Sequence, residues 1–206
     1  MVLETGHKER KRFEALEGQS AASMLVACQL VLCLWRDTAV VTMADGFVHT
    51  IMLIGGALSV WVVMGLRRFA EMRGIKGPFG LWAVAAGVGF LLQAFDIMLP
   101  ALHSQIMSHT WGVAVWLTLE GAVQLVWVAA LVCLGYGLYV QRHDFYGDLF
   151  MALAVAWALC LVVVGLSLSG VLGMRSLVLQ GGLLLVYNFI NALCFVSFYL
   201  LLRRTD

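Results

Sequence analysis

Six long apolar runs make up most of this chain of 206 residues. An α-helix needs roughly 20 predominantly apolar residues to cross the hydrocarbon core of a bilayer, and the runs are of about this length. Charged residues make up only 12% of the chain, against roughly 25% in a typical soluble domain. The runs lack the alternation of apolar and polar residues that transmembrane β-strands show. The sequence therefore predicts an all-α integral membrane protein with six transmembrane helices.

Charged pairs and turn-forming residues separate the apolar runs. We predict spans over residues 20–35, 38–66, 79–99, 111–140, 149–169 and 177–202. In an alternative division, the first span continues to Met43 and the chain turns at Asp45 and Gly46. The first division is favoured because two adjacent charges, Arg36 and Asp37, cost more inside lipid than a single Asp that faces protein.

Lysine and arginine residues are concentrated in the N-terminal segment, in the loops after the second and fourth spans, and at the C-terminus. Because basic loops stay in the cytoplasm, this pattern predicts an N-in/C-in orientation. Residues 1–19 are predicted to form an amphipathic cytoplasmic segment on the membrane surface, followed by the transmembrane domain over 20–203 and a cytoplasmic tail over 204–206. We expect a multi-pass protein of the inner or plasma membrane. A net charge of +1 without a basic patch argues against a nucleic-acid partner.

Ionisable side chains inside the predicted spans need an explanation, because a charge at the bilayer centre costs roughly 2.5 to 3.5 kcal/mol. Asp45 and His49 lie in the outer half of the second span, one helical turn apart on the same face. Asp96 lies near the outer end of the third span, and Glu120 lies about ten residues into the fourth. We expect all four at similar depth, in a polar cavity open to the outside. Further polar residues of this cavity are His103, His109, Gln93 and Gln124.

The four ionisable groups predict binding of a cation or a proton. Carboxylates and an imidazole from three helices can ligate a divalent cation, which is the candidate cofactor, or pass a proton between them. Structural roles are the alternative. Asp45 would then cap a helix or pair with Arg36, and His49 would bond a backbone carbonyl. Asp96 would reach the membrane interface, and Glu120 would be a protonated link between helices.

Two classes of function follow from these residues. The first is a small transporter or ion-handling membrane protein. The second is a non-catalytic subunit or sensor module of a larger membrane complex, in which the same groups make structural hydrogen bonds. An enzyme is less favoured, because the chain contains no nucleophile-elbow, zinc-protease or phosphate-binding motif.

Two segments, each with a pair of ionisable residues four positions apart, carry a resemblance to a known family. The stretch "DGFVH" ahead of a long apolar run, together with "DFYGD" at the start of the fifth span, resembles the transmembrane domain of the cation diffusion facilitator family. The resemblance implies that Asp45, His49, Asp144 and Asp148 hold a zinc-like ion. The first pair, however, falls toward the outside of the membrane and the second at its cytoplasmic edge, so a single site would require the fifth helix to shift inward.

Glycines recur within the spans and indicate where helices pack closely, because small residues let backbones approach. We expect these faces to make helix contacts and to support a homo- or hetero-oligomer. The glycines concerned are Gly55, Gly56, Gly87, Gly89, Gly135, Gly137, Gly181 and Gly182.

Overall fold

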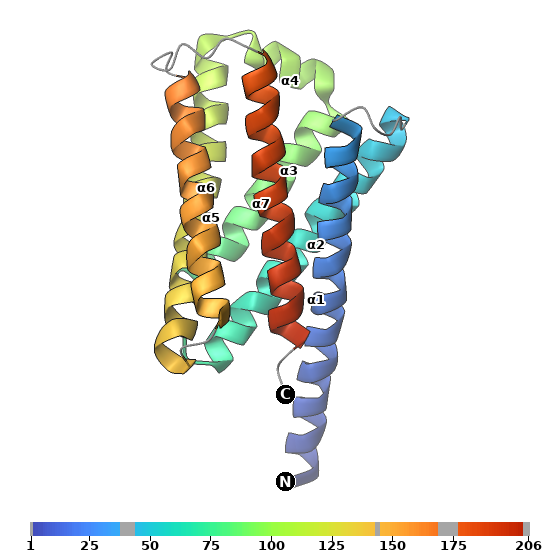
Figure 1. Ribbon diagram of the computed structural model, residues 1–206. Coiled ribbons are helices and arrows are strands. Elements are labelled where there is room, and N and C mark those ends of the chain that lie inside the picture. The colour runs from blue at the N-terminus through green and yellow to red at the C-terminus, as the bar shows by residue number, and fades with distance from the viewer. Residues whose placement is uncertain (1, 38–43, 143–144, 169–176, 204–206) are drawn as a thin grey trace.

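The computed structural model describes residues 2–37, 44–142, 145–168 and 177–203, and these residues contain helices and no strand (Figure 1). The predicted all-α class is therefore confirmed. The helices are α1 (Val2–Asp37), α2 (Asp45–Met72), α3 (Phe79–Met98), α4 (Pro100–Met107), α5 (Thr110–Arg142), α6 (Phe145–Leu168) and α7 (Leu177–Arg203).

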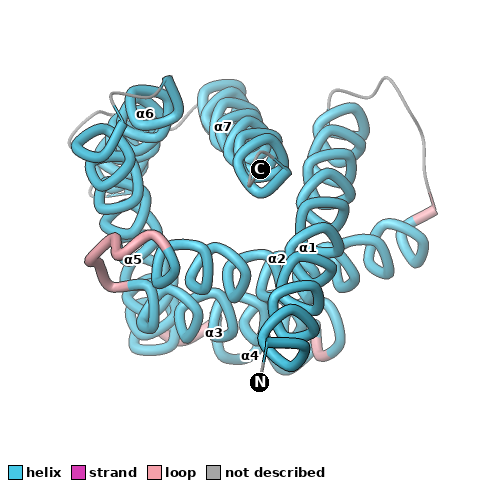
Figure 2. The backbone as a smooth tube through the Cα atoms, turned by 90° about the horizontal axis from the view of Figure 1, so that it is seen from below, coloured by secondary structure: helices cyan, strands magenta, loops and turns pink. Residues whose placement is uncertain are grey.

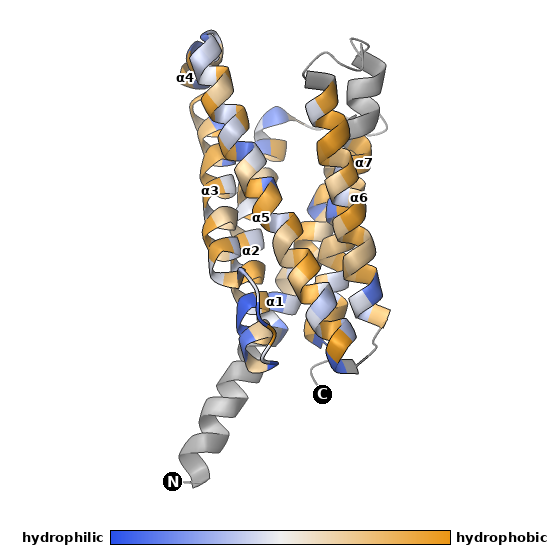
Figure 3. Ribbon diagram, turned by 90° about the vertical axis from the view of Figure 1, so that its left-hand side faces the viewer, coloured by the Kyte–Doolittle hydropathy of each residue, from blue (hydrophilic) through white to orange (hydrophobic). Residues whose placement is uncertain are grey.

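Six of these helices, all except α4, are long and apolar enough to cross a membrane. Many of their large apolar side chains point away from the bundle; Leu91 is 65% exposed and Leu159 is 60% exposed. Apolar residues extend along the length of the long helices (Figure 3). A surface of this kind is stable only in lipid, so the chain is a multi-pass membrane protein.

The six long helices form a closed ring. Each packs against the next in the order α1, α2, α3, α5, α6 and α7, and α7 packs against α1 (Figure 2). The short helix α4 packs against α3 and α5 at the end of the bundle opposite α1's first residues (Figure 1). We call this end the α4 end, and the opposite one, where α1 begins and α7 finishes, the termini end. The predicted orientation would place the α4 end outside the cell.

Helix α1 continues without a break through the predicted surface segment and the first predicted span. Its 36 residues make a helix about 54 Å long at a rise of roughly 1.5 Å per residue. This exceeds the roughly 30 Å thickness of a bilayer core, and the first turns project beyond the rest of the bundle (Figure 1). The arrangement of residues 1–19 on a membrane surface stays a prediction.

Two differences from the expected helices bear on the candidate site. Helix α2 begins at Asp45, after Ala44 in extended conformation, so Asp45 is its first residue and does not lie several residues inside it. The predicted start of this span at Thr38 lies outside the described residues. The predicted loop after the third span contains α4, which has Pro100 in its first turn. Proline is favoured there because the first helical N–H has no partner within the helix.

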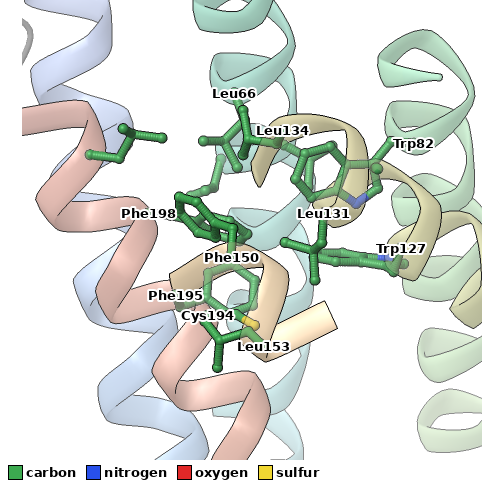
Figure 4. Packing of buried hydrophobic residues seen from close by; sticks show 14 of the residues in the cluster. Leu66, Trp82, Trp127, Leu131, Leu134, Phe150, Leu153, Cys194, Phe195 and Phe198 are labelled. Atoms are coloured by element: carbon green, nitrogen blue, oxygen red, sulfur yellow. The ribbon is translucent and has the colours of Figure 1, made fainter. Parts of the chain in front are cut away.

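The core lies in the half of the bundle nearer the termini end. Its centre is an aromatic cluster in which Trp82, Phe150 and Phe198 are fully buried (Figure 4). Trp127 packs edge-on against Trp82, at 5.2 Å between ring centroids. In contrast, α3 residues 87–98, all described, include no buried residue, and between residues 110 and 122 of α5 only Gly112 is buried. Where side chains are described, α3 and α5 are therefore closely packed toward the termini end and loosely packed toward the α4 end.

Several of the predicted glycine faces are used within the chain. Gly55 and Gly65 on α2 face side chains of α1, namely Gln29 and Gln19. The backbones of α5 and α6 meet where a Cβ added at Gly147 would lie 2.7 Å from Tyr139 N. The expectation of close helix packing is confirmed at Gly55, and Gly65 and Gly147 are further close contacts that were not predicted. It is wrong at Gly87, where no atom of the described residues lies within 4 Å of an added Cβ, and assembly into an oligomer stays a prediction.

Serine hydroxyls help to close the ring between α1 and α7. Ser23 Oγ donates to the backbone carbonyl of Phe195 at 2.6 Å in a buried setting, and Ser20 Oγ donates to that of Tyr199 at 3.2 Å. We expect Ser23→Ala to lower the free energy of unfolding by about 0.6 kcal/mol and at most about 1.7 kcal/mol, the average and the maximum found for hydrogen bonds between membrane helices. Unfolding in increasing amounts of a denaturing detergent measures this loss. Ser59→Ala is the control, because Ser59 Oγ bonds only one turn back, to Gly56 of its own helix.

Candidate functional site

A hydrogen-bonded pair of side chains joins the end of α3 to the start of α4. His103 Nδ1 lies 2.6 Å from Asp96 Oδ1, a short hydrogen bond between an imidazole and a carboxylate. Only Leu99 separates the two helices, and His103 N–H donates to its carbonyl, so both side chains lie within about one helical turn of the junction. The Asp96 side chain is 55% exposed and that of His103 is 21% exposed.

Trp116 connects the Asp96–His103 pair to Glu120 on α5. The ring of Trp116 lies 4.5 Å from that of His103 between centroids, and its Nε1 donates to Glu120 Oε1 at 2.9 Å. The indole thus contacts an imidazole with its ring and a carboxylate with its N–H. We call Asp96, His103, Trp116 and Glu120 the relay cluster; it joins three helices at the α4 end.

A second polar group begins one helical turn farther along α5. Gln124 Oε1 accepts a hydrogen bond from Trp157 Nε1 of α6 at 3.1 Å. Tyr187 of α7 is hydrogen-bonded to the side chains of Gln124 and Asn191. Because α6 stands between α5 and α7 in the ring, a contact between Gln124 and Tyr187 turns the Gln124 face of α5 toward the interior. Glu120, one turn away on the same side of the helix, is exposed and is the member of the relay cluster nearest in α5 to this inner group.

The relay cluster holds an excess of acidic groups. Asp96 and Glu120 are accompanied by one imidazole, that of His103, and the sequences of α3, α4 and α5 contain no Lys or Arg before Arg142 at the far end of α5. His109, in the turn between α4 and α5, stacks on Trp111 and is exposed. A cluster of this composition is suited to accept positive charge, as a proton or a cation.

Asp45 and His49 lie at the same end of the bundle but on a different helix. Both side chains are exposed in the first turns of α2. Helix α2 packs mainly against α1 and α3, whereas the relay cluster is built from α3, α4 and α5, so α3 stands between them. The structure therefore brings Asp96 and Glu120 into one network. A shared site that includes Asp45 and His49 stays a prediction.

The four residues implied by the family resemblance are not brought to one place. Asp148 is in the first turn of α6 at the termini end, while Asp45 and His49 are at the α4 end of α2, a helix about 42 Å long at roughly 1.5 Å per residue. Asp144 lies outside the described residues. Within the described part of the chain, no group of three or more His, Cys, Asp or Glu could hold a metal ion.

Two members of the relay cluster were not expected as functional groups. His103 was expected only to border the cavity, and Trp116 was not among the residues expected there. Two features of the sequence point to them. Pro100 favours a helix start just before His103. The spacing of Trp116, Glu120 and Gln124 puts all three along one side of α5. Gln93, expected in the same cavity, faces Gly56 of α2 instead.

Comparison with known proteins assigns no relative to this chain. No protein-family model, curated protein or solved structure matches it. The geometry of the relay cluster is therefore the basis for assigning a function.

Proposed function

We propose that this protein is a small polytopic membrane protein that binds and moves a proton or a small cation through the relay cluster. One observation carries the proposal. Two carboxylates, Asp96 and Glu120, are connected through His103 and Trp116 across three helices whose neighbouring sequence offers no Lys or Arg to neutralise them. Uncompensated acids of this kind in a membrane span most often mark an ion or proton path.

The packing of the bundle supports entry from the α4 end. Few of the described side chains of α3 and α5 are buried there, and Asp96 is more than half exposed, so an ion reaches the cluster without displacing the core. Beyond Glu120, the inner group around Gln124 and Tyr187 continues the polar side of α5. Farther on, Trp127 stacks on Trp157 at 5.7 Å, and passage through the membrane would require this aromatic pair to move. With the predicted orientation, the ion enters from outside the inner or plasma membrane.

Reconstitution into liposomes tests the proposal. Purified protein is inserted into vesicles that contain a pH-sensitive dye or a dye selective for one cation, and an ion gradient is imposed. We expect flux of at least one ion above that of protein-free vesicles. The matched control is Asp148→Asn, which removes an exposed acid at the termini end, and its flux should equal that of the wild type.

The alternative, a subunit or sensor module of a larger membrane complex, predicts a different result. The protein would then show no flux of any ion tested and would co-purify from its native membrane with a stoichiometric partner. That combination would contradict the proposal.

A further inference from the structure

We infer that the ion is the proton and that the Asp96–His103 pair binds it, an inference that rests on the proposed function. Two observations point to this pair. His103 Nδ1 is engaged by Asp96 at 2.6 Å. The other ring nitrogen, Nε2, is covered by protein atoms and has no hydrogen-bond partner among the described residues.

The geometry of the pair provides for one additional proton. When His103 is neutral, its Nδ1–H donates to the Asp96 carboxylate, and Nε2 keeps a lone pair. Addition of one proton from water to Nε2 changes the charge of the pair from −1 to 0, and no other bond forms or breaks. The imidazolium then faces Asp96 on one side, and the face of Trp116, 4.5 Å away between centroids, is within the range of a cation–π interaction.

A metal ion fits this pair less well than a proton. Histidine ligands to metals often donate their second N–H to a carboxylate, so the Asp96–His103 bond by itself is compatible with both. A metal bound at Nε2, however, needs further ligands, usually three or more. The described residues offer no such group, and Nε2 is covered by protein atoms.

The charges around His103 favour the same interpretation. Asp96 is the only titratable residue of α3, and His103 is the only one of α4. The half of α5 that packs against α4 contributes Glu120, while His109 in the adjoining turn is occupied with Trp111. A positive charge on His103 therefore contacts the carboxylate of Asp96, with that of Glu120 on the far side of Trp116, and meets no Lys or Arg from these elements. Trp116 contacts both His103 and Glu120, so it is the residue that links proton binding at the pair to the acid deeper in the bundle.

Nitrogen NMR of the full-length protein, labelled with ¹⁵N-histidine, in lipid nanodiscs tests the inference. His103 is assigned by the signal that disappears in His103→Gln, and His109 serves as the internal reference. At high pH we expect His103 to carry its proton on Nδ1, and on acidification we expect Nε2 to become protonated. Asp96→Asn should abolish the preference for the Nδ1–H form. Addition of Zn²⁺ should leave the His103 signals unchanged.

Flux measured with the same variants separates this inference from the proposed function. We expect His103→Gln to lower proton flux at least about tenfold, in keeping with the loss of a proton-transfer group, and His109→Gln to leave it unchanged. Direct coordination of Zn²⁺ by His103 Nε2 would overturn the inference in favour of a metal. A cation flux that depends on Glu120 but not on His103 would overturn the inference and leave the proposed function standing. Protonation of His103 as described, without flux of any ion in the wild type, would overturn the proposed function and with it the claim that the bound proton is moved.

Discussion

Replacing Glu120 with glutamine is expected to reduce ion flux in proteoliposomes to the level of protein-free vesicles. Glu120 is the deepest acid of the relay cluster, about three turns into α5 at 3.6 residues per turn. Glutamine has nearly the same size and keeps an oxygen that accepts the hydrogen bond from Trp116 Nε1, but it cannot carry a negative charge or release a proton. The substitution therefore removes the chemistry of this position and retains its shape.

Stability separates this effect from misfolding. Because the hydrogen bond with Trp116 is preserved, we expect the free energy of unfolding of Glu120→Gln to remain within about 0.5 kcal/mol of the wild type. Detergent-induced unfolding, followed by tryptophan fluorescence, measures this difference. If flux is unchanged in Glu120→Gln, Glu120 serves only as a structural partner of Trp116, and the relay cluster does not conduct.

The largest effect on stability is expected from Gly147→Ala. A Cβ at this position would lie 2.7 Å from Tyr139 N, 2.9 Å from Tyr139 Cα and 3.0 Å from the Gly135 carbonyl oxygen. All three atoms belong to the backbone of α5, so no side chain can rotate away and the two helices must separate. We expect a loss of about 1 to 3 kcal/mol, the usual cost of overpacking. The midpoint of thermal or detergent-induced unfolding measures it.

Gly87→Ala is the matched control, and it is expected to change stability in the opposite direction. No atom lies within 4 Å of a Cβ added at Gly87 on α3. Alanine is favoured over glycine inside a helix by up to about 1 kcal/mol, so this variant should be as stable as the wild type or slightly more stable. Equal destabilisation by the two substitutions would show that α5 and α6 do not depend on close backbone contact at Gly147.

Part of the candidate site followed from local spacing and part did not. The positions of Asp96 near the end of α3 and of Glu120 about three turns into α5 were predictable, because the rise of a helix converts sequence distance directly into depth. The position of Asp45 was not, since the expected helix start preceded it, whereas α2 begins at Asp45 itself. The contact between His103 and Trp116 could not be predicted either, because it requires the unexpected helix α4 to fold back against α5.

The sequence by itself determined the environment of this protein and the number of its spans. Length and apolar composition are properties of each segment alone, and a lipid solvent permits few backbone structures other than helices. Only the tertiary structure decided which apolar faces are core and which face lipid: Trp82 is fully buried, while Leu91 on the same helix is 65% exposed. Composition cannot distinguish these faces, because lipid tails are as apolar as a protein core. The relay cluster, too, was decided only by the tertiary structure. The order of helices around the ring places Asp96 of α3 and Glu120 of α5 on either side of the His103 imidazole and the Trp116 indole.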